Sequence, residues 1–212
     1  NTDSEEEGEI YMGCAGGIDF TSNLHLDREA VPAGFETFKL TLKGLKGGHS
    51  GGEIHVGLGN ANKLLVRFLA GHAEELDLRL IDFNGGTLRN AIPREAQALL
   101  LVPADQGAEL ATRLEQHAAL LRQELSEVDS NLQILLQDAA QPTTCLDSDT
   151  QSRLLAALVA CPNGVIRMSQ AIAGVVETST NLGVIKTEAG QVFVQCLIRS
   201  LNDEGRRYVE QM

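Results

Sequence analysis

Between residues 35 and 139 the spacing of apolar residues changes in a fixed order, and this order limits the possible folds more than any other feature. Phe35 to Leu45, FETFKLTLKGL, alternates apolar and polar residues, which is typical of a strand with one buried face. Residues 60–72 instead space their apolar side chains for an amphipathic helix. The pattern then predicts a strand, a strand, a helix and a strand, at residues 76–86, 94–103, 106–128 and 131–139.

This order of elements predicts an α+β fold. Strand-helix-strand-strand-helix-strand is the order of the ferredoxin-like sandwich, an antiparallel sheet of four strands with two helices on one face. With no Trp and only 4% aromatic residues, the core of such a fold must be aliphatic.

The last third of the chain predicts further elements. They are a helix, two strands and a short helix, at residues 148–160, 174–186, 191–201 and from about Asn202. Asp147 or Ser148 is the expected N-cap of the first of these helices. The extra strands either extend the ferredoxin-like sheet or form a smaller companion, and the pattern leaves both open. Residues 1–34 are expected to be extended and rich in turns, because clustered Gly and Pro oppose a helix.

Charge and hydropathy exclude several kinds of partner. The formal net charge of −12 repels nucleic acid and anionic lipid surfaces, and the basic residues are scattered. No apolar run approaches the roughly 20 residues of a membrane span. The cysteines form no CxxC pair, and a chain of this size needs no disulfides, so reduced thiols in a cytoplasmic protein are expected. They are Cys14, Cys145, Cys161 and Cys196.

A glycine-rich loop, KGGHSGGEIHVGLGN, follows the first predicted strand and carries His49 between two pairs of glycines. Glycine lets the backbone take positive φ values and approach a ligand closely. A histidine on such a loop can donate a hydrogen bond to a developing oxyanion or bind a metal. The alternatives are an incidental histidine on an exposed turn, and a phosphate cradle before a helix. The loop lacks the lysine and serine of a P-loop, which weakens the phosphate interpretation.

Two further segments carry candidate polar groups. Asn90 lies in NGGTLRNAIPREA, between two predicted strands, and its amide can both donate to and accept from a peptide backbone. A plain turn between strands explains the same residues. Arg199 lies near the end of the apolar segment QCLIRSL, where its guanidinium can bind a carboxylate in a forked geometry. An ion pair of Arg199 with Asp203 or Glu204 is an equal alternative.

Taken together, GLKGGHSGG after an amphipathic strand and GGTLRNAIP further along the chain resemble a known family. They are similar to the lid or dimerisation domain of the dizinc aminoacylase and carboxypeptidase metallopeptidases. The similarity is greatest to the bacterial aminoacyl-histidine dipeptidases, also called cytosol nonspecific dipeptidases, and extends over essentially the whole chain. In that family, NTDSEEEGEIYMGCAGGIDF is the stretch that leaves the catalytic domain and enters the lid.

The resemblance implies roles for five residues. Asp3 matches a carboxylate zinc ligand. His49 matches the lid histidine that stabilises the oxyanion of the scissile carbonyl. In dimerising relatives this histidine serves the active site of the neighbouring subunit. Asn90 matches a residue that contacts substrate, and Asn181 is a weaker candidate facing the same cleft. Many relatives have an arginine at the end of the strand after the NxIP turn, where this chain has Val102 and Pro103. The grip on the substrate's C-terminal carboxylate is therefore assigned to Arg199.

The resemblance also implies what lies elsewhere. Residues 1–16 are expected to be the edge of a catalytic domain and a hinge, and residues 17–212 the lid, with the return to the catalytic domain missing. Two zinc ions are implied, but the other zinc ligands and the general base are not in this chain, nor is an HExxH motif. We therefore expect a lid that acts on dipeptides with its own catalytic domain, and an isolated chain that is inactive and binds no zinc stably.

A second class of function stays open. A ferredoxin-like module without catalytic residues can bind a small ligand or join two subunits through its open sheet edges and outer helices. The two interpretations are compatible, because lids of the family often form homodimers through this sheet. They differ on His49, which a pure assembly module does not need.

Overall fold

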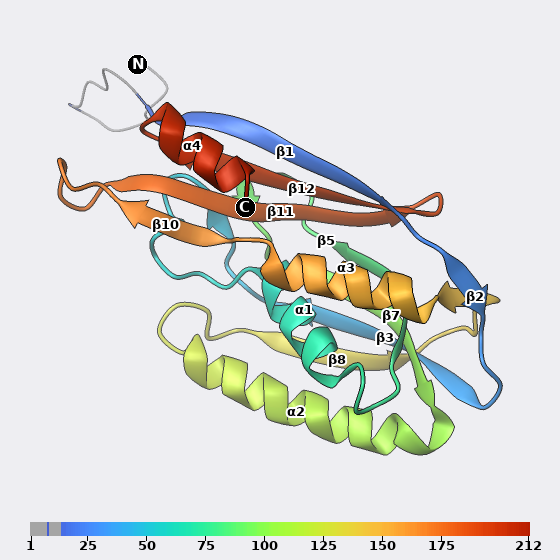
Figure 1. Cartoon of the computed structure of the whole chain (residues 1–212). Helices are drawn as coiled ribbons and strands as arrows, with labels where there is room; N and C mark the ends of the chain where they lie inside the picture. The colour runs from blue at the N-terminus through green and yellow to red at the C-terminus, as the bar shows by residue number, and fades with distance from the viewer. Residues whose placement is uncertain (1–7, 9–13) are drawn as a thin grey trace.

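The computed structural model describes residue 8 and residues 14–212, and these residues form twelve strands and four α-helices (Figure 1). The strands are β1 (Gly16–His25), β2 (Arg28–Ala30), β3 (Phe35–Lys43), β4 (Gly48–His49), β5 (Arg79–Gly85), β6 (Ala91–Ile92), β7 (Ala96–Pro103), β8 (Gln133–Asp138), β9 (Thr144–Leu146), β10 (Gly164–Met168), β11 (Val176–Glu188) and β12 (Gln191–Ser200). The helices are α1 (Ala61–His72), α2 (Gly107–Glu124), α3 (Ser148–Ala160) and α4 (Asp203–Glu210). None of these helices is long and apolar enough to cross a membrane.

The ferredoxin-like prediction is confirmed. Strands β3, β5, β7 and β8 lie side by side in the order β5-β7-β3-β8, and every neighbouring pair is antiparallel. Along the chain, helix α1 lies between β3 and β5, and helix α2 lies between β7 and β8. Each predicted element of this region is present within a few residues of its expected bounds.

The C-terminal strands extend this sheet and do not form a companion. Strand β11 pairs with β5 at Ile185 and Lys186, β12 and β10 both pair with β11, and β1 pairs with β12, so the main sheet has eight strands among the described residues (Figure 1). The prediction for residues 1–34 missed that β1 is a regular strand. Its apolar residues Ile18, Phe20 and Leu24 do alternate with polar residues, but most of its side chains are exposed. Backbone pairing with β12 along its whole length makes it a strand.

Local signals set several element boundaries. The Asn60 side chain accepts a hydrogen bond from Lys63 N and caps α1. Asp147, one of the two residues expected to cap α3, accepts from Thr150 N in the same way. Strands β11 and β12 are joined by Ala189 and Gly190, both with positive φ, and such a two-residue turn matches the twist of an antiparallel hairpin.

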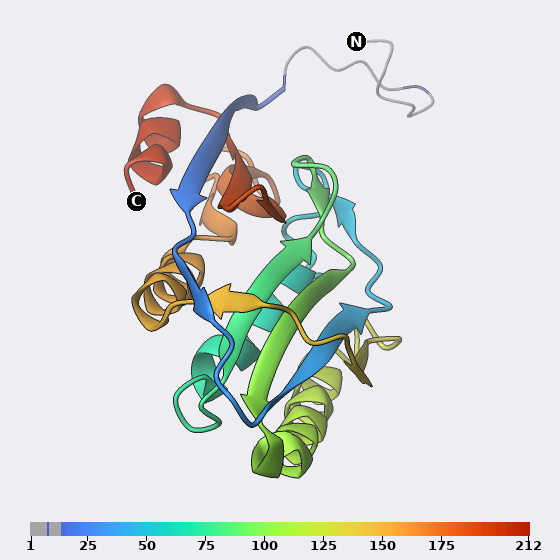
Figure 2. The same ribbon diagram turned by 90° about the vertical axis from the view of Figure 1, so that its right-hand side faces the viewer.

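The helices cover one face of the sheet, and most of the core lies beneath them (Figures 1 and 2). Leu40, Leu80 and Leu100 come from three neighbouring strands and are fully buried against Leu65 and Leu69 of α1. The opposite face of β5 and β7 is covered by the short β2–β9 ribbon over a smaller apolar cluster (Figure 2). The core is aliphatic, as the composition predicted, with few aromatic members.

Candidate functional site

The glycine-rich loop between β3 and α1 is closed at its base by one buried carboxylate. Asp129 is 1% exposed, and its Oδ1 and Oδ2 atoms accept hydrogen bonds of 2.7 Å from Lys46 N and Gly59 N. The two ends of the loop are therefore held together although thirteen residues of sequence separate them. Sequence reasoning did not select Asp129, because an Asp between a helix and a strand also suits an ordinary turn.

His49 lies in β4, which pairs with β6 so that His49 is opposite Ala91. The Nδ1 atom of its ring accepts hydrogen bonds from the backbone N–H groups of Gly51, at 3.3 Å, and Gly52, at 3.0 Å. Because Nδ1 accepts, the ring proton lies on Nε2. His49 is exposed, so Nε2–H is the group of this ring that can donate to a ligand.

Arg199 lies beside the same loop, although it comes from the distant strand β12. A Cβ atom added to Gly51 would lie 3.1 Å from Arg199 Nε and 3.1 Å from His49 Cε1. Both side chains therefore flank Gly51 closely, and a larger residue there would push them apart. Gly51 has no side chain, and this lets the side chains of His49 and Arg199 approach it so closely.

The guanidinium of Arg199 is not used in an ion pair within the described part of the chain. Asp203 and Glu204, the partners considered from the sequence, pair instead with Arg206 and Arg207. Arg199 Nε is buried and finds no hydrogen-bond acceptor among the described residues. The structure thus leaves the guanidinium available for an anionic group.

The turn that carries Asn90 packs directly against the histidine loop. Ser50 N donates a hydrogen bond of 3.0 Å to Asn90 O. Asn181 is fully buried in β11, and its amide donates to Arg89 O at 2.9 Å and Ala91 O at 2.8 Å. Asn181 therefore holds the backbone on both sides of Asn90, whose own side chain is exposed.

These contacts bring His49, Asn90 and Arg199 to one end of the sheet, with Asn181 and Asp129 holding the backbone that carries them. The arrangement offers hydrogen-bond donors and a positive charge to a ligand with a polar carbonyl and a carboxylate. Asp3, the expected zinc ligand, lies outside the described residues. Within the described residues no group of three or more His, Cys, Asp or Glu side chains could hold a metal ion, so they do not fit a dizinc centre.

The comparisons with known proteins agree with this geometry. A family model described as "Peptidase dimerisation domain" matches residues 40–129. Over all of its 212 residues the chain is 66% identical to the cytosol non-specific dipeptidase of Escherichia coli and covers 44% of that protein. The crystal structure of aminoacylhistidine dipeptidase from Vibrio alginolyticus matches with a TM-score of 0.96 at 56% identity, over 99% of this chain and 43% of that one. The chain spans less than half the length of these relatives.

The fold and the histidine loop define a peptidase dimerisation domain. Such a domain is a ferredoxin-like sheet, here widened by β11, β12 and β1. The chain corresponds to one segment of the longer dipeptidases that it resembles.

Replacing Asp129 by Ala tests its role at the base of the loop. The change leaves two buried N–H groups without an acceptor, and we expect it to lower the free energy of unfolding by about 2–5 kcal/mol. Urea denaturation followed by circular dichroism measures this value. Asp138→Ala, in the exposed end of β8, is the matched control and should change it by less than about 0.5 kcal/mol. Equal stability of the two variants would contradict the role of Asp129.

Proposed function

We propose that the chain is the lid of a zinc-dependent dipeptidase that hydrolyses Xaa-His and other dipeptides. In this proposal His49 Nε2–H donates to the oxyanion that develops on the scissile carbonyl, and Arg199 binds the free C-terminal carboxylate of the substrate. The observation that carries it is the placement of both side chains against Gly51, with the ring proton of His49 on the exposed nitrogen.

The chemistry of a dipeptide suits this pair of groups. In a dipeptide one residue separates the scissile carbonyl from the terminal carboxylate, so an arginine at a fixed distance from the oxyanion donor selects for length. A hydrogen bond aimed at the developing oxyanion stabilises the transition state more than the substrate, and so it raises the rate. In this proposal Asn90, which is exposed between β5 and β6, contacts the substrate backbone.

The metal and the general base belong to the catalytic domain in this proposal. Residues 1–16 are its edge and hinge, with Asp3 as one zinc ligand, and residues 17–212 are the lid. The described residues do not form a metal site by themselves. We expect the 212 residues alone to be inactive, and zinc-dependent hydrolysis of a dipeptide by the isolated chain would refute this.

Assembly is the second part of the proposal. The match to a dimerisation domain supports a homodimer formed through the lid. Strand β8 is an open edge of the sheet. Leu135 in β8 and Leu120 in α2 are both exposed apolar residues. A monomer mass for the full protein by light scattering would exclude this assembly. The similarity to the cytosol dipeptidase of Escherichia coli supports a cytoplasmic location.

His49→Ala in the full protein tests the oxyanion donor. We expect kcat for a dipeptide to fall by roughly 10²–10³-fold, because the donor acts mainly in the transition state. Steady-state kinetics measure the effect. His55→Ala is the matched control, since His55 is exposed on the same loop and should leave kcat nearly unchanged. An unchanged kcat in the His49 variant would remove this residue from catalysis.

Arg199→Ala tests recognition of the carboxylate. We expect KM for a dipeptide to rise by about 10- to 100-fold with a smaller change in kcat, because a charge-assisted hydrogen bond to the substrate is lost. A dipeptide amide lacks the carboxylate, and its KM should be equal in the variant and the wild type. Arg167→Ala, on exposed β10, controls for loss of a positive charge. A parallel rise in KM for the dipeptide and its amide would contradict the assignment.

A further inference from the structure

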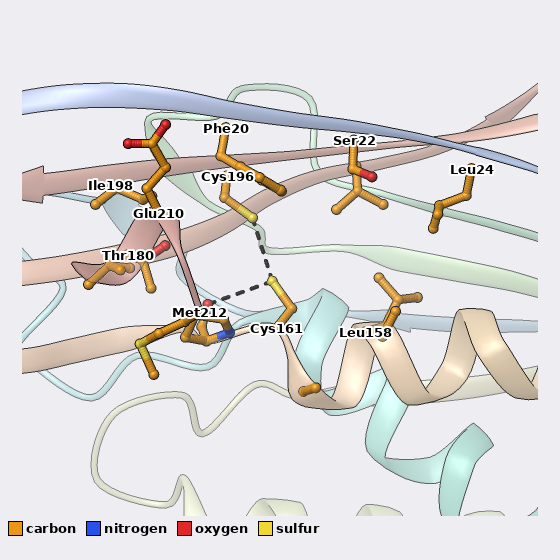
Figure 3. A pocket seen from close by; sticks show the side chains of 15 residues that line it. Phe20, Ser22, Leu24, Leu158, Cys161, Thr180, Cys196, Ile198, Glu210 and Met212 are labelled. Atoms are coloured by element: carbon orange, nitrogen blue, oxygen red, sulfur yellow. Dashed lines mark hydrogen bonds between the residues drawn. The ribbon is translucent and has the colours of Figure 1, made fainter. Parts of the chain in front are cut away.

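Two cysteines that are far apart in the sequence meet at an apolar pocket (Figure 3). Cys161 is the C-cap residue of α3, Cys196 lies in β12, and their Sγ atoms are 3.6 Å apart. The proposed peptidase function uses neither of them. The other two cysteines lie elsewhere, Cys14 exposed before β1 and Cys145 buried in β9.

This pocket is lined by both cysteines. It has a volume of about 300 Å³ and lies between α3, α4 and the strands β1, β11 and β12. Its walls are mainly apolar, and include Phe20, Leu24, Leu158 and Ile198 (Figure 3). Cys161 is half-buried, whereas Cys196 is 3% exposed directly behind it. A small molecule that enters the pocket therefore meets Cys161 with a second thiol in contact.

A positive charge is held beside this pair. The ammonium group of Lys63 donates hydrogen bonds of 2.8–2.9 Å to the carbonyl oxygens of Leu158, Val159 and Cys161, at the end of α3. The hydrogen bond from Cys196 and the charge of Lys63 lower the pKa of Cys161 to about 7, against the opposing effect of burial. The same hydrogen bond and burial raise the pKa of Cys196. At neutral pH a substantial fraction of Cys161 is therefore thiolate, whereas Cys196 keeps its proton.

We propose that Cys161 and Cys196 form a modification site that reduces a hydroperoxide and closes into a reversible disulfide. The Cys161 sulfur attacks one peroxide oxygen, the O–O bond breaks, and water or an alcohol leaves with a proton, so that Cys161 becomes a sulfenic acid. The Cys196 sulfur then attacks the Cys161 sulfur. The S–O bond breaks, the S–S bond forms, and water leaves with the proton of Cys196. The two thiols lose two electrons, and the peroxide gains them.

The geometry favours this outcome over a stable sulfenic acid. A disulfide requires the sulfurs to approach by about 1.5 Å, which is a small movement for two side chains already in contact. The bond would tie the end of α3 to β12, the strand that carries Arg199. Asn163 follows Cys161 closely and accepts hydrogen bonds from Asn60 and Leu182, so the oxidised pair is also linked to the cap of α1.

The test uses the full protein in its reduced form, treated with about one equivalent of hydrogen peroxide, alkylated and mapped by mass spectrometry. We expect the peptides that contain Cys161 and Cys196 to be joined, with a mass about 2 Da below the sum of the two thiol peptides, and to separate again on reduction. The rate of joining should rise about tenfold per pH unit below pH 7 and level off above it, because the thiolate reacts.

Variants separate the two steps. Cys196→Ala replaces one small buried group by another, and in this variant a 1,3-dicarbonyl probe should label Cys161 as sulfenic acid. Cys161→Ala should give no label and no disulfide. Cys145→Ala is the matched control for a buried cysteine and should still form the pair. Recovery of Cys161 and Cys196 as free thiols from the treated wild type, or joined to other cysteines, would overturn the proposal. This readout does not depend on peptidase activity, so it stands or falls separately from the proposed function.

Discussion

The arrangement of this molecule depends on a small set of buried asparagine side chains. The Asn60 amide caps α1 through its oxygen, and its nitrogen donates to Asn163 Oδ1 and Leu182 O. Asn181, its neighbour in β11, holds the turn that carries Asn90. A buried amide without partners destabilises a fold, whereas these amides are bonded to three separate segments. The ferredoxin-like half and the C-terminal strands are therefore joined by specific hydrogen bonds as well as by apolar packing.

This network requires two backbones to pass very close to each other. Gly183 lies at an irregularity of β11, and a Cβ atom there would lie 2.6 Å from Arg89 Cα. Gly86, which has a positive φ, also lies against β11. It has no room for a side chain beside Gly183. The glycines allow the turn to lie against the strand, and Asn181 then fixes it there. The exposed groups of the site are thus carried by a rigid support, which is what orientation of a substrate requires.

Much of the fold could be predicted from the sequence, because local signals and the final structure agree. The alternation in β3 and the cap at Asp147 depend on neighbouring residues, and both were predicted, as was the start of α1 near Asn60. Strand β1 was missed because its alternation is short and its side chains are mostly exposed, so that pairing with the distant β12 is what holds it in the sheet. For the site, the sequence indicated His49, Asn90 and Arg199, which the structure brings together. It could not show that Asn181 supports a turn or that Asp129 closes a loop, because both act on backbone groups far away in the chain.

The surroundings of Arg199 differ from those of an arginine that serves stability. A structural arginine in a strand is normally paired with an acid, because a half-buried charge without a partner is costly. The cross-strand neighbours of Arg199 are instead two small residues, Gly17 in β1 and Ser179 in β11. They leave space beside the guanidinium and supply no negative charge. A protein with a net charge of −12 has many carboxylates that could have been placed there. Among the described residues the guanidinium beside His49 therefore has no acidic partner, which is the feature on which the proposed binding of a carboxylate rests.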